Sequence, residues 1–227
     1  MRAQSTVESR FSPTEALAAR TALLGQQEEP LRTAGTVIEV AEGREICVEG
    51  EETETFYKVV SGVVRVCKFL NDGRRQIEAF HVAGEIFGLE LGPERVLAAE
   101  AVTDCSLISY RRRNVEQQAK SDQVISQQLF QHAMQGLARA QSHSLLLGRR
   151  GAAEKVAVFL LEWAAKAGKG DSLHLSMSRQ DIADYLGLTI ETVSRSMSQF
   201  ERDGVIALSG ARQLRVVSRG ALQSLAA

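Results

Sequence analysis

The chain contains few cysteines, and none of them belongs to a closely spaced pair of the kind that binds metals. Its three cysteines are Cys47, Cys67 and Cys105, and each stands alone in an apolar segment. An iron–sulfur cluster held by four thiolates is therefore excluded. We expect each thiol to pack as a small apolar side chain. A redox role for one exposed thiol is the alternative.

Long apolar runs and the short motifs of common enzymes are also absent. No stretch approaches the roughly 20 apolar residues that span a bilayer, and the N-terminus has no basic start followed by an apolar run. No G-x-S-x-G, G-x-x-x-x-G-K-[ST] or H-E-x-x-H sequence occurs, which argues against catalysis. We therefore expect a cytoplasmic protein that is not an enzyme and that uses no cofactor and no membrane.

Charge is divided unevenly along the chain. Residues 1–147 hold 16 basic and 20 acidic side chains, a net charge of −4, whereas residues 148–227 hold 11 and 8, a net charge of +3. A nucleic-acid surface therefore fits the second part better than the first. Because 227 residues exceed one typical domain, we assign residues 148–227 to a separate DNA-binding domain.

Residues 30–110 consist of short apolar segments separated by glycine-containing turns. They include TVIEV, TFYKVVSGVVRVCKFL and VLAAEAVTDCSLISY, and Asn71–Gly73 forms a hairpin turn between two such segments. This spacing predicts an antiparallel β-barrel or jelly roll, as the main part of a sensor-like domain at residues 1–112. We expect an amphipathic helix at Pro13–Leu24 to cover it.

Residues 113–147 change to a helical period. Apolar residues recur there at three- and four-residue steps; they are Ile125, Leu129, Phe130, Ala133, Met134, Leu137 and Ala140. The pattern predicts one helix of about 34 residues, extending about 50 Å. Because one barrel face cannot cover this length, we expect the apolar stripe to form the interface of a parallel homodimer. Two shorter helices packed within one monomer are the alternative.

Residues 178–202 predict two short helices joined by a glycine turn. Ser178 and Asp181 form a capping-box-like start. Gly187 ends the first helix, because glycine enters the left-handed region at little cost, and Thr189 caps the second. This is the pattern of a helix-turn-helix that binds DNA.

The second helix leaves four side chains outward in its first two turns, where a recognition helix meets base edges. They are Ile190, Glu191, Ser194 and Arg195. Arg195 can donate two hydrogen bonds to guanine, Glu191 can accept one from cytosine, and Ile190 can contact a thymine methyl. Ser194 can bond to a base or a phosphate. The pattern predicts a T-rich half-site with one essential G·C pair. A simple Glu191–Arg195 ion pair on a solvated helix is the alternative.

A wing follows the recognition helix. Two apolar strands flank a turn at Ser209–Ala211, which predicts a two-stranded hairpin. We expect Arg212 and Arg215 to contact phosphates, which fix register without reading sequence; either arginine could instead be a solvated strand residue. Further phosphate contacts are expected near the helix starts, from Ser178, Arg179, Thr189 and Thr192. In a homodimer, two recognition helices about 34 Å apart would read a palindrome.

The segment SRQDIADYLGLTIETVSR, followed by the wing, resembles the DNA-binding domain of the Crp-Fnr superfamily of bacterial transcription regulators. The order of barrel, long helix and winged helix extends this resemblance over nearly the whole chain. It implies a homodimer that binds double-stranded DNA and works with RNA polymerase. The spacing of Glu191, Ser194 and Arg195 is similar to the Fnr-like and FixK-like branches, which implies the operator TTGA-N6-TCAA.

The effector-binding residues of the superfamily are matched only in part. The cyclic-nucleotide branch uses Gly-Glu-Leu followed by Arg-Ser, whereas this chain has Gly88-Leu89-Glu90 and then Arg95-Val96. Arg95 alone could bind a phosphate, or it could lie at the surface or pair with a neighbouring carboxylate. Haem ligation by His81 lacks a second ligand. The other histidines, which we expect to face solvent, are His132, His143 and His174.

Without recognisable effector chemistry, the chain resembles the FixK-like branch most. The resemblance implies an effector-independent activator of genes for low-oxygen respiration or nitrogen fixation. Two alternatives remain: a regulator gated by a cyclic nucleotide or by redox state, and a scaffold protein that no longer binds DNA. The last residues, Ser224–Ala227, resemble a tail read by a bacterial degradation protease, or they are an incidental frayed end.

Overall fold

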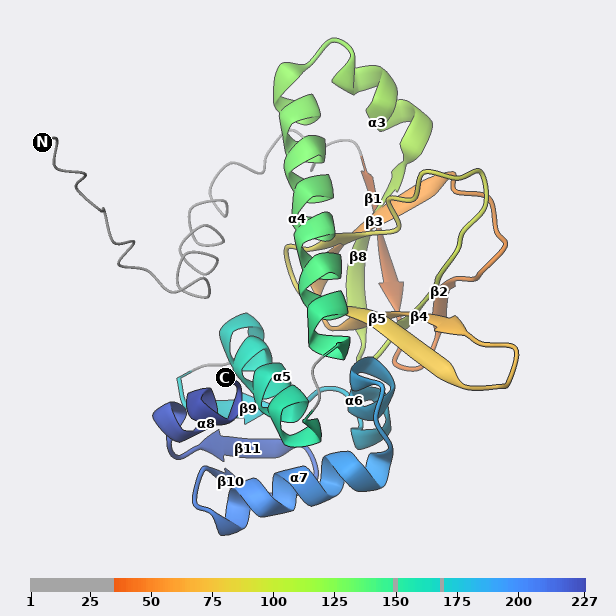
Figure 1. Cartoon of the computed structure of the whole chain (residues 1–227). Helices are drawn as coiled ribbons and strands as arrows, with labels where there is room; N and C mark the ends of the chain where they lie inside the picture. Colours follow the sequence, from red (N-terminus) through yellow and green to blue (C-terminus); the bar gives the residue numbers. More distant parts are fainter. Residues whose placement is uncertain (1–34, 149–150, 168–169) are drawn as a thin grey trace, which may run out of the picture.

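The computed structural model describes residues 35–148, 151–167 and 170–227 (Figure 1). Along these ranges a β-sheet domain is followed by helices and then by a small α+β domain. The helix expected at Pro13–Leu24 lies outside the described residues. None of the described helices combines the length and the apolar character that a membrane span needs.

The N-terminal domain is a jelly roll of two antiparallel sheets. Its strands are β1 (Gly35–Val40), β2 (Glu45–Cys47), β3 (Thr55–Ser61), β4 (Val64–Phe69), β5 (Arg75–His81), β6 (Ile86–Phe87), β7 (Ala98–Ala101) and β8 (Cys105–Arg111). They pair in the orders β1-β8-β3-β6 and β2-β7-β4-β5. The jelly roll is therefore confirmed. A closed barrel is not formed, because the described pairing does not continue from one sheet into the other.

Apolar side chains fill the space between the sheets, and glycine turns join the strands. Val59, Val64 and Leu107 are completely buried in this core. The hairpin predicted at Asn71–Gly73 joins β4 to β5. Gly73 has a φ of 84°, a left-handed value that glycine adopts at little cost.

The helix expected over residues 113–147 is broken in two. α3 spans Arg112–Ala119 and α4 spans Gln123–Leu147. Between them Asp122 has an extended backbone, and its carboxylate accepts hydrogen bonds from the N–H groups of Val124 and Ile125. These bonds satisfy free donors of a new helix start, so the prediction of a single helix is wrong. α4 nevertheless runs along the β domain and ends beside the C-terminal domain (Figure 1).

The C-terminal domain packs helices onto a small sheet. Its described elements are α5 (Ala152–Ala167), β9 (Ser172–His174), α6 (Arg179–Leu186), α7 (Ile190–Arg202), β10 (Ile206–Leu208), β11 (Gln213–Val216) and α8 (Arg219–Leu225). The predicted wing hairpin is β10 and β11, and β9 adds a third strand in the order β10-β11-β9. Leu160, Ile182 and Met197 belong to its buried core.

An aromatic cluster joins the two domains. Phe80 of β5 lies 5.6 Å from Tyr185 and 6.2 Å from Trp163, measured between ring centroids. His143 of α4 stacks on Tyr185 at 4.1 Å between ring centroids, and its Nε2 lies 2.8 Å from the Tyr185 carbonyl oxygen. His143 is buried, so the expectation that it faces solvent is wrong.

Candidate nucleic-acid interface

The first helix of the helix-turn-helix, α6, has the start and the end that its sequence predicts. The Ser178 hydroxyl accepts a hydrogen bond from the Asp181 N–H at 3.1 Å, and the Asp181 carboxylate accepts one from the Ser178 N–H at 2.9 Å. This reciprocal pair is a capping box. At the other end Gly187 has a φ of 62°, which turns the chain toward α7.

The recognition helix, α7, divides its side chains between an apolar face and an exposed face. Val193, Met197 and Phe200 are buried against the rest of the domain. The four side chains predicted to read bases are all exposed, in the first two turns; they are Ile190, Glu191, Ser194 and Arg195. The exposed face therefore carries an apolar surface, a hydroxyl, an acceptor and a guanidinium, which is the set that base reading requires.

Glu191 and Arg195 are available for contacts outside the chain. Hydrogen bonds at the start of α7, from the Glu191 N–H and the Thr189 hydroxyl, lower the pKa of the Glu191 carboxyl, and the charge of Arg195 adds to this effect. Glu191 is therefore an ionised acceptor at neutral pH. Within the described residues no direct ion pair joins the two side chains, so neither group is committed to the other.

The predicted phosphate-binding hydroxyls have local partners. Ser178 also donates from its Oγ to the Asp181 carboxylate at 2.8 Å, and the hydroxyl oxygens of Thr189 and Thr192 lie 3.0 Å apart. Arg179 is half-buried, and burial lowers the pKa of its guanidinium. These groups surround the starts of α6 and α7, where free N–H groups favour an anion.

The wing arginines lie in β11 and directly before it. Arg212 follows the turn, which contains Gly210 with a φ of 107°, and its carbonyl oxygen accepts a hydrogen bond from Leu175 at 2.7 Å. Arg215 lies in β11 opposite Ala207. Both side chains are exposed. The geometry leaves both free to reach a phosphate backbone, and that role stays a prediction.

Sequence reasoning missed a group of ion pairs between the domains. Arg65 of β4 donates to the Asp181 carboxylate at 3.2 Å. Arg75 of β5 donates from Nε and Nη2 to the Asp184 carboxylate at 2.9 and 2.8 Å, and it also contacts Asp181. Glu100 of β7 accepts from Arg65 at 2.5 Å. We call these five residues the interdomain clamp. The partners are about a hundred residues apart in sequence, so no local pattern predicts it.

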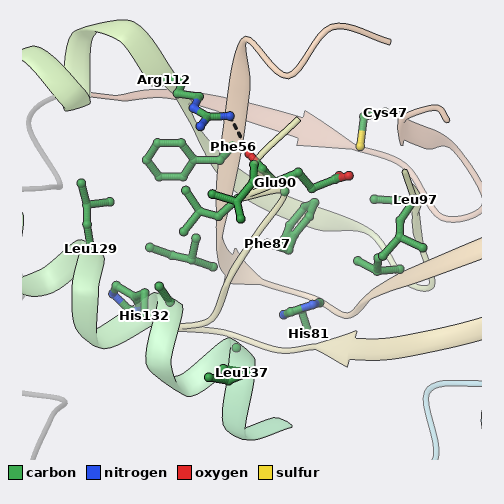
Figure 2. A pocket seen from close by; sticks show the side chains of 18 of the residues that line it. Cys47, Phe56, His81, Phe87, Glu90, Leu97, Arg112, Leu129, His132 and Leu137 are labelled. Carbon is green, nitrogen blue, oxygen red and sulfur yellow. Dashed lines mark hydrogen bonds between the residues drawn. The ribbon is translucent and has the colours of Figure 1, made fainter. Parts of the chain in front are cut away.

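A cavity of about 670 Å³ lies between the jelly roll and α4. Its lining is mainly apolar and includes Phe56, Phe87 and Leu97 from the β domain and Leu129 and Leu137 from α4, which Figure 2 shows around one space. At the rim Arg112 donates to the carbonyl oxygen of Glu90 at 2.5 Å (Figure 2). His132, which was expected to face solvent, is half-buried and borders this cavity.

Arg95, the candidate phosphate ligand, is used inside the protein. Its side chain is 2% exposed and donates from Nη2 to the Thr55 carbonyl oxygen at 2.6 Å and to the Thr55 hydroxyl at 3.1 Å. The guanidinium also lies over the Tyr57 ring, 5.8 Å from its centroid. The alternative of a surface position for Arg95 is therefore wrong. The alternative of a carboxylate partner agrees with the structure, because Arg95 Nη1 lies 3.9 Å from the Glu90 carboxylate.

His81 and the cysteines have environments that favour their neutral forms. Burial holds the pKa of His81 well below its ordinary 6.5, and the charges of Lys166 and Arg139 act in the same direction. Burial also raises the pKa of the Cys67 thiol to about 11 and raises those of Cys47 and Cys105. Thiolates react and thiols do not, so these buried cysteines are poor redox sensors.

The predicted dimer stripe on α4 is mostly exposed in the single chain. Phe130 is 66% exposed, Leu137 50% and Met134 46%, and Ala133 and Ala140 are exposed beside them. Leu129 is half-buried. Ile125 differs, because it is buried in its own subunit against a cluster that includes Phe56 and Ile108. We therefore leave Ile125 out of the interface.

Comparison with known proteins gives two family matches and close relatives. Residues 37–122 match the cyclic nucleotide-binding domain, and residues 154–225 match the Crp-like helix-turn-helix domain. The nitrogen fixation regulation protein FixK of Rhizobium meliloti (strain 1021) is 44% identical over 183 residues, covering 81% of this chain and 83% of that protein. FixK of Azorhizobium caulinodans is 45% identical over 196 residues, covering 84% and 79%.

A solved structure agrees with the same comparison. The structure of FixK2 from Bradyrhizobium japonicum is 45% identical, covers 85% of this chain and 98% of that chain, and superposes with a TM-score of 0.81. The likeness therefore extends over the β domain, α4 and the helix-turn-helix together.

Proposed function

Since the chain belongs to the FixK branch of the Crp-Fnr superfamily of transcription regulators, we propose that it activates its target genes as a homodimer on the operator TTGA-N6-TCAA. It is a DNA-binding transcription activator. The operator sequence, the homodimer and the independence from an effector are proposals that go beyond this family assignment.

The exposed face of α7 is the observation that carries this proposal. Glu191 and Arg195 lie one helical turn apart on the same face, with Ile190 and Ser194 beside them. An arginine matches guanine through two hydrogen bonds, and a carboxylate matches the amine of cytosine. Together they fit the G·C pair within TTGA, whereas the apolar surface of Ile190 fits a thymine methyl.

The apolar stripe on α4 supports a homodimer. Phe130, Met134 and Leu137 recur at four- and three-residue steps and expose about half of their surface or more. Exposed apolar stripes at this spacing are typical of helices that pair along their length. A twofold axis along α4 would place two recognition helices in successive major grooves, about 34 Å apart.

The engagement of Arg95 supports effector independence. A cyclic nucleotide needs a cation for its phosphate, but Arg95 is buried on Thr55 and Tyr57, and the neighbouring position is Val96. A phosphate would have to reach a guanidinium that is 2% exposed and whose Nη2 is already bonded to Thr55. The buried thiols with raised pKa values argue against redox gating in the same way.

The setting follows from the relatives. The FixK relatives are nitrogen fixation regulation proteins, so we infer that this activator serves nitrogen fixation or low-oxygen genes. Such a role implies RNA polymerase as a partner and the cytoplasm as the location.

Binding of purified, ligand-free protein to two fluorescent duplexes tests the proposal. One duplex carries TTGA-N6-TCAA, and the other has both half-site G·C pairs changed. We expect tight binding to the first duplex and at least about tenfold weaker binding to the second, because each mismatch costs about 1–3 kcal/mol. Sedimentation of the complex should give two protein subunits per duplex. Equal binding to both duplexes, or a monomeric complex, would contradict the proposal.

A further inference from the structure

The interdomain clamp shares one carboxylate between two tasks. One oxygen of Asp181 accepts hydrogen bonds from the N–H and the hydroxyl of Ser178. The other oxygen accepts from Arg65 and Arg75, which come from adjacent strands of the β domain. The start of α6 and its contact with the β domain therefore depend on the same side chain.

The clamp is largely shielded from water. The side chains of Arg65 and Arg75 are 19% and 17% exposed, and those of Asp181 and Asp184 are 6% and 13% exposed. Burial acts to raise the pKa of Asp181, but the hydrogen bonds from Ser178 and the two arginine charges outweigh it and lower the pKa. Asp181 thus stays ionised, and its charge stays matched by the arginines.

The clamp gives the DNA-binding domain a second attachment point. The first is the aromatic cluster around Phe80, and the second is at the start of α6, held by side chains from β4 and β5. Both sets of contacts join α6 to β5, and Lys166 of α5 adds a hydrogen bond to the Phe80 carbonyl oxygen, so together they restrict the orientation of the helix-turn-helix on the β domain. Neither attachment covers α7, whose reading side chains remain exposed.

We propose that Arg65 and Arg75 are positioning residues for DNA binding, which set the orientation of the helix-turn-helix on the β domain. In a dimer this orientation determines the distance and the rotation between the two recognition helices. The proposal rests on the proposed function, because spacing has meaning only for a homodimer on a palindrome. It assigns to the β domain the task of selecting the operator spacing.

Operators of different spacing test this role. Adding or removing one base pair between the half-sites moves them by about 3.4 Å and rotates them by about 34° relative to each other. Affinities are measured for TTGA and TCAA separated by five, six and seven base pairs, and for a duplex with a single half-site. The wild-type protein should prefer six base pairs, and it should bind the single half-site weakly.

Arg75→Ala should reduce the preference for six base pairs by at least about tenfold, equivalent to about 1.4 kcal/mol, and leave the single half-site affinity unchanged. Asp184→Asn removes the charge that Arg75 Nε and Nη2 bind but leaves the contact of Arg75 with Asp181. It should therefore reduce the preference in the same direction but less than Arg75→Ala, and the double variant should add little to Arg75→Ala. Arg75→Lys keeps the charge but loses the bidentate contact, so its preference for six base pairs should lie between those of the wild type and Arg75→Ala. Arg74→Ala is the matched control, because Arg74 is 78% exposed and pairs with Asp72 in the hairpin turn.

Thermal unfolding of each variant establishes that it is folded. If Arg75→Ala does not fold, the spacing preference of Asp184→Asn tests the proposal instead. A loss of affinity that is equal for the single half-site and for all three spacings would overturn the positioning role. So would a wild-type preference for six base pairs that the folded variants retain. A wild-type protein with no preference for spacing or for the G·C pair would instead contradict the proposed function itself.

Discussion

Arg195 in the DNA-binding domain and Arg95 in the β domain show two opposite uses of the same side chain. Arg195 is exposed on the outer face of α7. Arg95 is buried, and its guanidinium is engaged by the Thr55 carbonyl oxygen and the Tyr57 ring. Arg195 is thus accessible to a partner outside the chain, whereas the guanidinium of Arg95 makes contacts within its own domain.

The comparison supports the proposal that a fold related to cyclic nucleotide-binding domains serves here in a regulator that needs no nucleotide. A ligand that pulled Arg95 away from Thr55 would leave a buried carbonyl oxygen unpaired, which costs about 1–3 kcal/mol. An exposed side chain carries no such cost. The β domain therefore supports the DNA-binding domain mechanically, through the aromatic cluster and the interdomain clamp.

The largest effect is expected from removing the internal arginine. Arg95→Met keeps most of the apolar volume but leaves the Thr55 carbonyl oxygen without its donor, so it should lower the free energy of unfolding by about 3 kcal/mol. Preference for the operator G·C pair should not change. Chemical denaturation and duplex binding measure the two properties. If Arg95→Met were as stable as the wild type, the structural role that we assign to Arg95 would be wrong.

A somewhat smaller effect is expected from the exposed arginine, on the opposite property. Arg195→Ala should weaken operator binding by about 2 kcal/mol and relax the requirement for guanine, with little change in stability. Arg202→Ala is a suitable control, because Arg202 is exposed at the last position of α7, far from the first two turns. Retained discrimination in Arg195→Ala would show that this residue does not read the base.

The wing arginines should show a weaker and sequence-independent effect. Arg212→Ala and Arg215→Ala should each reduce binding to all duplexes by about 1 kcal/mol and lower the slope of log affinity against log salt by about one. Titrations at several salt concentrations measure this slope. If these variants instead lost discrimination between duplexes, the division between reading and positioning contacts would be wrong.

The smallest effect concerns pH at the junction of the two domains. Burial lowers the pKa of His143 below its ordinary 6.5, so the unfolded state binds the proton more readily than the folded state. The contribution of His143 to stability is present above pH 6.5 and declines as the pH falls below it, by at most about 1.4 kcal/mol per pH unit.

Unfolding measured from pH 7.5 to 5.5 should therefore show a shallower decline for His143→Gln than for the wild type. Some decline should persist, because the pKa of His81 is lowered in the same direction. An identical pH dependence in both proteins would show that His143 does not contribute to the loss of stability at low pH.

The two domains also differ in how far their sequence predicts them. Ser178, Gly187 and Thr189 act on backbone groups within a few residues, so the helix-turn-helix could be predicted almost residue by residue. The strands and the hairpin at Asn71–Gly73 follow from local patterns in the same way. What could not be predicted depends on distant partners, as in the stacking of His143 on Tyr185 and the clamp at Asp181.

Two other differences between the predicted and the observed structure concern α4. The apolar residues behind the prediction of one helix begin at Ile125, so they carry no information on the segment before Asp122, whose carboxylate caps a second helix start. Ile125 belongs to the same apolar series as Leu137, yet it packs into its own subunit against Phe56 and Ile108. Periodicity identifies an apolar face and does not say which partner covers it.

Operator affinity with and without a cyclic nucleotide tests the central claim most directly. Affinity for TTGA-N6-TCAA is measured for the ligand-free protein and again with saturating cAMP or cGMP, at the same salt concentration. We predict tight binding, dependent on the G·C pair, with an equal dissociation constant in all three conditions. Binding that requires a nucleotide would show that the β domain gates the recognition helix, and it would contradict the account.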